Sequence, residues 1–143
     1  MNRHRAGQSQ YMKYLLSAFF LSVACSVYAQ QNKINPNGYN TFYYENGQIS
    51  SEGTMVGGQP DGYWKTYYEN GTLKSEGNRK NFMLDSVWKF YDENAKLILE
   101  ITYKNDKKNG IRRTFQENEV IEENFTDDVK QGNTLYYYPD GKL

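Results

Sequence analysis

One aromatic position recurs along the chain and provides the first candidate binding residues. Tyr43, Tyr67, Tyr91, Phe115 and Tyr137 follow one another at intervals of 24, 24, 24 and 22 residues. Aromatic rings on a polar face suit a glycan, a peptide or another protein as ligand. A second interpretation is that the rings only pack on one another along a sheet. The two interpretations are compatible, because one edge of the column can stay in contact with water.

The residue types of most catalytic and metal sites are nearly absent. His4 is the only histidine and Cys25 is the only cysteine, and both lie in an N-terminal segment that has the pattern of an export signal. The rest of the chain therefore lacks the residues for a Ser-His-Asp or Cys-His catalytic site, for a zinc site of His and Cys, or for a disulfide. We expect a protein that is not an enzyme and that binds no metal and no cofactor.

Three pairs of neighbouring acids are the remaining candidates for acid–base chemistry or calcium binding. They are Asp92-Glu93, Glu122-Glu123 and Asp127-Asp128. The pairs lie at different positions of the repeat described below, and neighbouring residues of a strand point to opposite faces. We therefore expect these acids to be solvated surface residues.

Residues 1–29 have the pattern of a signal peptide. An apolar run over residues 14–29 follows Lys13 and ends in the small-x-small sequence V-Y-A at Ala29, which suits signal peptidase. A membrane-spanning helix is the alternative, but the run is shorter than the roughly 20 residues that a span needs, and polar residues follow at once. We predict cleavage between Ala29 and Gln30 and export to the periplasm, the outer membrane or the outside of the cell.

A second interpretation of this segment involves Cys25. The sequence S-V-A-C that ends at Cys25 resembles a bacterial lipobox, whose cysteine is acylated after cleavage, although Ser22 stands where that motif usually has leucine. We expect contact with a membrane only if Cys25 is lipidated. Beyond residue 29 the chain has 14 basic and 17 acidic residues, so its net charge is −3. This charge disfavours binding to an anionic lipid surface or to nucleic acid.

The chain repeats itself after a short predicted linker over residues 30–37. The units are 38–61, 62–85, 86–109, 110–131 and a partial unit, 132–143. A glutamate follows the aromatic column in the first four units, at Glu45, Glu69, Glu93 and Glu117. Glycine opens every unit except the third. We expect the backbone to need the conformational freedom of glycine at these opening positions. Columns that align at a fixed period are the signature of a repeat architecture.

Turn signals within the units predict β-hairpins. Asn46-Gly47, Asn70-Gly71 and Asp140-Gly141 are preferred pairs for two-residue type I′ turns, which need positive φ at both residues. The flanking segments are rich in Tyr, Phe, Trp, Thr and Ile, which favour strands, and no segment has a helical period. We therefore predict an all-β fold, an elongated single-sheet antiparallel β-meander of about nine strands.

The same turns predict a register. With a two-residue turn, Trp64 lies opposite Gly77 on an apolar face of the sheet. Charged residues then meet across strands on the other face. Two cross-strand ion pairs are predicted, Lys65 with Glu76 and Lys89 with Glu100.

The residues from Gly62 to Gly77 carry a resemblance to a known family. Their pattern, G-x-W-x-x-Y-Y-x-N-G-x-L-x-x-E-G, resembles the MORN-repeat variant. Bacterial proteins built from this variant are often labelled the YwqK-type antitoxin family. The resemblance extends over residues 37–143 and implies an elongated β-meander whose usual role is binding, without assigned catalytic residues. The antitoxin label implies that a toxin is neutralised by direct contact.

These observations lead to one functional expectation and one alternative. We expect an exported, non-enzymatic repeat protein that acts as an interaction module in the bacterial envelope or outside the cell, with a protein or a glycan as its partner. The alternative is an antitoxin or immunity-type protein that neutralises a toxin by binding it. An open edge strand also invites pairing with another chain, so an edge-strand homodimer is a further hypothesis.

Overall fold

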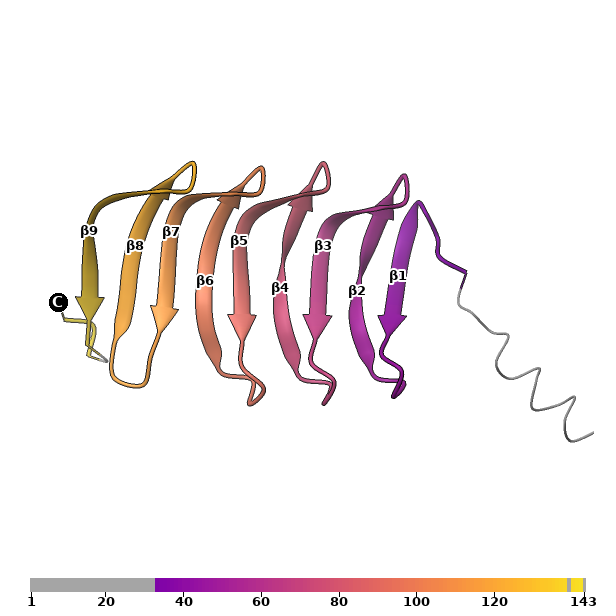
Figure 1. Ribbon diagram of the computed structural model, residues 1–143, viewed down its shortest axis with the longest axis horizontal. Helices are drawn as coiled ribbons and strands as arrows, with labels where there is room; N and C mark the ends of the chain where they lie inside the picture. Colours follow the sequence, from indigo (N-terminus) through magenta and orange to yellow (C-terminus); the bar gives the residue numbers. More distant parts are fainter. Residues whose placement is uncertain (1–32, 139, 143) are drawn as a thin grey trace, which may run out of the picture. The chain divides into compact units, whose positions relative to one another are not determined.

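The part of the chain that the structure describes forms one antiparallel β-sheet. The computed structural model describes residues 33–138 and 140–142. Nine strands pair in chain order to form a meander (Figure 1). The strands are β1 (Gly38–Tyr43), β2 (Ile49–Val56), β3 (Gln59–Tyr67), β4 (Leu73–Lys80), β5 (Met83–Tyr91), β6 (Leu97–Lys104), β7 (Lys107–Phe115), β8 (Val120–Thr126) and β9 (Val129–Tyr137). This architecture confirms the predicted single-sheet β-meander.

The predictions for the N-terminal segment concern residues that the structure does not describe. The lipidation candidate Cys25 and the predicted cleavage site between Ala29 and Gln30 lie outside the described residues. Within the part that the structure describes, no helix is long and apolar enough to cross a membrane.

Two kinds of turn alternate along the chain, at opposite ends of the strands (Figure 1). The wide turns follow the odd-numbered strands at residues 44–48, 68–72, 92–96, 116–119 and 138–142. The narrow turns follow the even-numbered strands at residues 57–58, 81–82, 105–106 and 127–128. We call the two ends of the sheet the wide-turn end and the narrow-turn end.

The wide turns correct a prediction about turn type. The Gly47 N–H donates to the Tyr44 carbonyl (3.0 Å), and the Tyr44 N–H donates to the Gln48 carbonyl (2.8 Å). This is a three-residue loop with positive φ only at its last residue, 84° at Gly47. The Asn46 Oδ1 accepts a hydrogen bond from the Gln48 N–H (2.9 Å), so the asparagine stabilises the turn through its side chain. The prediction of two-residue type I′ turns was wrong for Asn46-Gly47, Asn70-Gly71 and Asp140-Gly141.

The type I′ geometry occurs at the narrow turns instead. Both residues of each narrow turn have positive φ, with values between 49° and 79°. The pairs are Gly57-Gly58, Asn81-Phe82, Asn105-Asp106 and Asp127-Asp128. Asn and Asp tolerate this conformation better than other non-glycine residues do. Side chains also help, because Asp106 Oδ1 accepts the Leu84 N–H (2.7 Å) and Asp128 Oδ1 accepts the Lys108 N–H (2.9 Å).

The predicted register nevertheless holds away from the wide turns. Trp64 lies opposite Gly77 and Lys65 lies opposite Glu76 in the register, as expected. The predicted ion pair between Lys65 and Glu76, however, is not among the ion pairs of the described residues. A register shift between Thr66 and Tyr67 inserts one extra residue into β4. The extra residue compensates for the three-residue loop, so the pairing farther along the strands is the one that a two-residue loop would give.

Each odd-numbered strand after β1 bulges near its narrow turn. Gly53 pairs with Trp64, but Met55 pairs with Pro60, so three residues of β3 lie opposite the single residue Thr54. Gly62, inside this bulge, has a φ of 74°. The bulge leaves the Thr54 carbonyl free to accept a hydrogen bond from Trp64 Nε1 (2.8 Å). Glycine is used here because left-handed backbone is strained for other residues.

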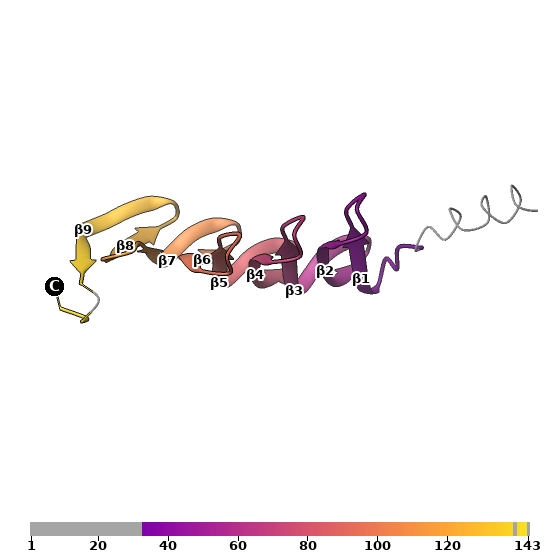
Figure 2. The same cartoon turned by 90° about the horizontal axis from the view of Figure 1, so that it is seen from below.

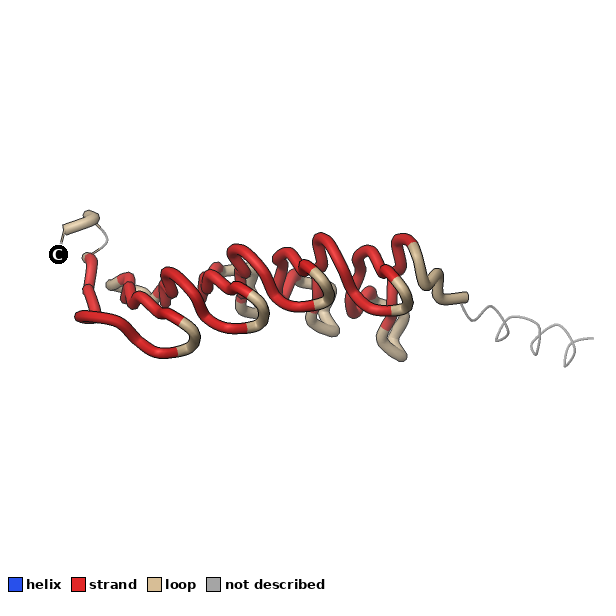
Figure 3. Tube along the Cα trace, turned by 90° about the horizontal axis from the view of Figure 1, so that it is seen from above, coloured by secondary structure: helices blue, strands red, loops and turns tan. Residues whose placement is uncertain are grey.

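The bulges bend the strands, so the sheet curls instead of lying flat. Figures 2 and 3 show this curl in each unit when the sheet is seen from below and from above. Leu84 and Tyr103, on the narrow-turn side of the bulges, pack against the same cluster as Phe42 and Phe90, on the other side. The curl thus gives a one-layer protein a covered apolar face.

We call this covered face the tryptophan face. Trp64 and Trp88 are only 7% and 4% exposed. Each indole lies flat over a glycine, because a Cβ on Gly53 would come within 2.5 Å of the Trp64 ring and one on Gly77 within 2.3 Å of the Trp88 ring. Only glycine leaves room for the indoles to lie this close to the backbone.

Candidate functional site

The opposite face carries a row of charges with alternating sign. The members are paired neighbours on β2 to β8: Glu52, Lys65, Glu76, Lys89, Glu100, Arg113 and Glu122. Lys89 Nζ lies 3.8 Å from Glu100, which confirms that predicted ion pair, and Arg113 Nε lies 2.8 Å from Glu122. Opposite charges on adjacent strands stabilise a sheet modestly. We call this face the tyrosine face, after the residues that border the row.

The predicted aromatic column lies on this face, on the odd-numbered strands. Tyr43, Tyr67, Tyr91, Phe115 and Tyr137 end β1, β3, β5, β7 and β9. An even-numbered strand separates neighbouring members, so they are about 9.6 Å apart, too far for direct ring stacking. The hydroxyl groups contact carboxylates instead. Tyr67 Oη donates to Glu52 (2.6 Å), and Tyr91 Oη donates to Glu76 (2.8 Å).

A second tyrosine flanks each of these two carboxylates. Partial desolvation is the largest cause that raises the pKa of Tyr39, and a hydrogen bond to Glu52 and the negative charge of Glu52 raise it further. Desolvation and Glu76 raise the pKa of Tyr63 in the same way. Glu52 therefore lies between Tyr39 and Tyr67. We call this arrangement and its copy around Glu76 the two tyrosine–glutamate clasps.

The clasps keep their phenols protonated. Desolvation, the hydrogen bond to Glu76 and the charge of Glu76 raise the pKa of Tyr91 from 10.0 to about 12. Desolvation and Glu52 raise the pKa of Tyr67 in the same direction. Tyr67 and Tyr91 each donate to a carboxylate, which holds these two rings in one orientation. The arrangement presents oriented rings beside negative charge.

An exposed strip of large side chains runs beside the row, toward the narrow-turn end. It consists of the second residue of each complete unit: Tyr39 (61% exposed), Tyr63 (53%), Val87 (47%) and Ile111 (37%). Aromatic and aliphatic side chains that share an exposed surface are typical of binding patches. Sequence analysis missed this strip because its residue type changes from tyrosine to valine and isoleucine. The alternation of Tyr63, Lys65 and Tyr67 along one strand was the signal that could have found it.

A groove lies at the wide-turn end, between the turns of the first three hairpins. It has a volume of about 390 Å³ and is lined by Tyr44, Tyr68, Glu69, Asn70 and Glu93. Sequence analysis did not assign a role to Tyr44 or Tyr68, the second residues of the two aromatic doublets. The structure gives them one, because Tyr44 Oη donates to the Tyr67 carbonyl (2.7 Å) and Tyr68 Oη donates to the Tyr91 carbonyl (2.8 Å).

In the described part of the chain, the three acid pairs do not combine into a metal-binding group. No group of three or more His, Cys, Asp or Glu residues there could hold a metal ion. Glu122 and Glu123 lie on opposite faces, where they pair with Arg113 (2.8 Å) and Arg112 (3.5 Å). Their role in the sheet is to form ion pairs.

Comparison with known proteins identifies the repeated hairpins. Three segments match the family model of the MORN repeat variant, at residues 36–56, 60–81 and 84–105. Each match spans one pair of strands joined by a wide turn: β1–β2, β3–β4 and β5–β6. No curated protein matches the chain.

Proposed function

We propose that the chain, whose residues 36–105 belong to the MORN repeat variant family, is an exported, non-enzymatic module that binds a protein partner through its tyrosine face. MORN repeats indicate a repeat-based binding module. We place the protein in the bacterial envelope or outside the cell, because residues 1–29 have the pattern of a signal peptide.

The exposed strip and the clasps beside it are the observation that carries this proposal. Oriented tyrosine rings supply large contact area at low entropic cost, and their carboxylate partners supply hydrogen-bond acceptors. The strip continues from Tyr63 into Val87 and Ile111, which offer apolar area but no polar group. Such a mixed surface suits a protein better than a glycan, whose hydroxyl groups need polar partners.

A matched pair of substitutions tests the binding face. Tyr63 and Tyr136 are both 53% exposed, but they lie on opposite faces. Leu135 pairs with Glu122 of the charge row, so the next residue, Tyr136, points to the tryptophan face. The chain without residues 1–29 serves as bait against periplasmic and extracellular fractions, and affinities are then measured with the purified partner. We expect Tyr63→Ala to weaken binding about tenfold, whereas Tyr136→Ala leaves it unchanged. Equal effects of the two substitutions would refute the proposed face, and binding of a purified glycan alone would refute a protein partner.

An immunity-type function is the second candidate. The resemblance to antitoxin proteins supports it, and the same face would then bind a toxin. The intact mass of the mature protein from fractionated cells separates the candidates. A species that begins at Gln30, or a diacylated species that begins at Cys25, supports the envelope module. An uncut chain in the cytoplasm would overturn export and favour the antitoxin.

A further inference from the structure

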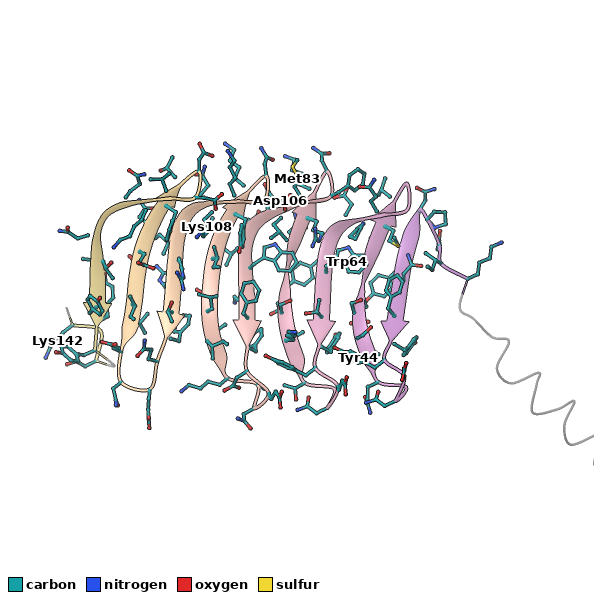
Figure 4. All side chains as sticks on the ribbon, viewed as in Figure 1. Tyr44, Trp64, Met83, Asp106, Lys108 and Lys142 are labelled. Carbon is teal, nitrogen blue, oxygen red and sulfur yellow. The ribbon has the colours of Figure 1, made fainter. Side chains whose placement is uncertain are left out.

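The groove at the wide-turn end is built from parts that are already fixed. Tyr44 and Tyr68 reach from one hairpin to the backbone of the next and use their hydroxyl groups in those hydrogen bonds. Asn46 Nδ2 likewise donates to the Glu69 carbonyl (3.1 Å), and Asn70 Nδ2 donates to the Glu93 carbonyl (3.4 Å). The rings and the turns that carry the two glutamates are therefore held in place before any ligand binds. Figure 4 shows Tyr44 at this end of the sheet.

The groups left for a ligand are ring faces and carboxylates. The phenolic hydroxyls are occupied, so each ring offers its π-system. Glu69 and Glu93 are exposed, and within the described residues neither belongs to an ion pair. Aromatic faces beside carboxylates are the usual components of a site for an organic cation.

One of the lining residues, Tyr68, already contacts a cation. Lys74 Nζ lies 5.3 Å from the centre of the Tyr68 ring. This distance is within the range of a favourable cation–π contact. The ring is thus accessible to an ammonium group in the folded protein.

The neighbouring turn lacks the aromatic part of the groove. Asp92 stands where the preceding units have Tyr44 and Tyr68, and Gln116 stands there in the unit that follows. The glutamate column continues at Glu117, so acidity persists where the rings are lost. This difference separates a built site from a merely acidic edge.

We propose that this groove binds the ammonium or guanidinium group of a lysine or arginine side chain on a basic segment of a partner protein. The cation takes the place of Lys74 at the Tyr68 ring and pairs with Glu69 and Glu93. The inference goes beyond the proposed function, because it concerns another surface and specifies the charge of what binds there. The tyrosine face takes no part in it, so either surface can fail its test independently of the other.

An amide-resolved NMR titration of the chain without residues 1–29 tests the proposal. The probe is Nα-acetyl-lysine amide, and its Nε-acetylated analogue is the uncharged control. We expect the charged probe to shift the amides of Asn70, Glu93 and their neighbours saturably, and the neutral analogue to leave them unchanged. Added salt weakens binding by screening the carboxylates. Equal shifts with the two probes would overturn the proposal.

Matched variants separate the site from net charge. Tyr68→Leu removes the aromatic face and is expected to weaken binding about two- to fivefold, whereas Tyr68→Phe, which keeps the ring, stays close to the wild type. Glu93→Gln is expected to weaken binding to a similar degree, and Glu117→Gln, at the same repeat position without rings, leaves it unchanged. An equal loss in Glu93→Gln and Glu117→Gln would show general acidity and overturn the built site. The glutamine variants alter only exposed side chains, so this comparison remains decisive if Tyr68→Leu does not fold.

Discussion

The first three hairpins and the strands that follow them share a backbone plan but not a set of contacts. In β1–β6, indoles lie on glycines, tyrosines clasp glutamates, and tyrosines link one wide turn to the next. In β7–β9, Arg112 stands at the position of Trp64 and Trp88, and it pairs with Glu123 (3.5 Å) at the position of the glycine. A charge pair thus replaces the packing of indole on glycine while the meander continues. The sheet depends on its backbone pairing, whereas both proposed binding surfaces depend on aromatic residues of the first three hairpins.

The turn of the fourth hairpin shows how the shorter unit is accommodated. The Gln116 N–H donates to the Glu119 carbonyl (2.9 Å), which closes a loop of only two residues. The pairing of β7 with β8 runs from Gly110 to Phe115 without a register shift. Compared with the preceding units, this unit therefore lacks one residue of the loop and the extra residue in the even-numbered strand that follows the loop. These two losses account for the unit of 22 instead of 24 residues.

The largest expected effect separates the two regions by stability. Trp88→Ala removes a buried indole and leaves a cavity, so we expect the free energy of unfolding to fall by about 3–5 kcal/mol. Arg112→Ala, at the equivalent position, removes a partly buried ion pair, but Lys130 still lies 3.7 Å from Glu123, so the expected cost is about 1 kcal/mol. Urea denaturation followed by circular dichroism measures both. Similar losses in the two variants would mean that the regions do not differ in this way.

The glycines beneath the indoles give the next largest effect. Gly77→Ala places a Cβ about 2.3 Å from the Trp88 ring, and the displacement of that ring is expected to cost about 1–3 kcal/mol. Glu123→Ala is the matched substitution in the fourth hairpin, and we expect its cost to be about 1 kcal/mol or less. Trp fluorescence should shift in Gly77→Ala, because the indole becomes more exposed. An unperturbed spectrum with wild-type stability would contradict the flat packing.

A strained turn offers a smaller, stabilising change. Ala95 has a φ of 63° at the position where Gly47 and Gly71 occupy the other wide turns. Ala95→Gly relieves this left-handed strain and is expected to stabilise the protein by about 1 kcal/mol. Gly71→Ala should destabilise it by a similar amount. The shift of the urea midpoint in opposite directions checks the pair, and a loss of stability in Ala95→Gly would refute the strain.

The smallest effect appears at high pH and tests the clasps. The pKa of Tyr91 is raised from 10.0 to about 12, so above pH 10 the unfolded chain loses this proton before the folded protein does. Stability from this group is therefore present below pH 10 and is lost as the pH rises toward 12. Absorbance at the phenolate band should show a tyrosine that titrates late, and Glu76→Gln should bring its pKa back toward 10. An unchanged titration in that variant would exclude the clasp as its cause.

Sequence reasoning succeeded where the pattern is local or periodic. The unit length, the strands on either side of each turn and the opposite-face positions of Trp64 and Lys65 follow from residues close together in the chain. The pairing of Lys89 with Glu100 was predictable as well, because an antiparallel register follows from loop length once bulges compensate. The prediction of turn type was wrong, because Asn-Gly occurs in more than one kind of loop. The backbone hydrogen bonds that distinguish these loops cannot be inferred from the two residues alone.

The sequence alone determined that this chain is an array of β-hairpins with one apolar and one polar face, because that follows from period and alternation. The tertiary structure decided which residues come into contact on each face. Bulges near the narrow turns curl the sheet over its tryptophans, and pairing across strands brings Tyr39 and Tyr67 to the same glutamate. Contacts between hairpins build the groove from residues 23 to 49 positions apart, Tyr44 to Glu93. These features depend on the hydrogen bonding of distant backbone segments, which no local pattern specifies.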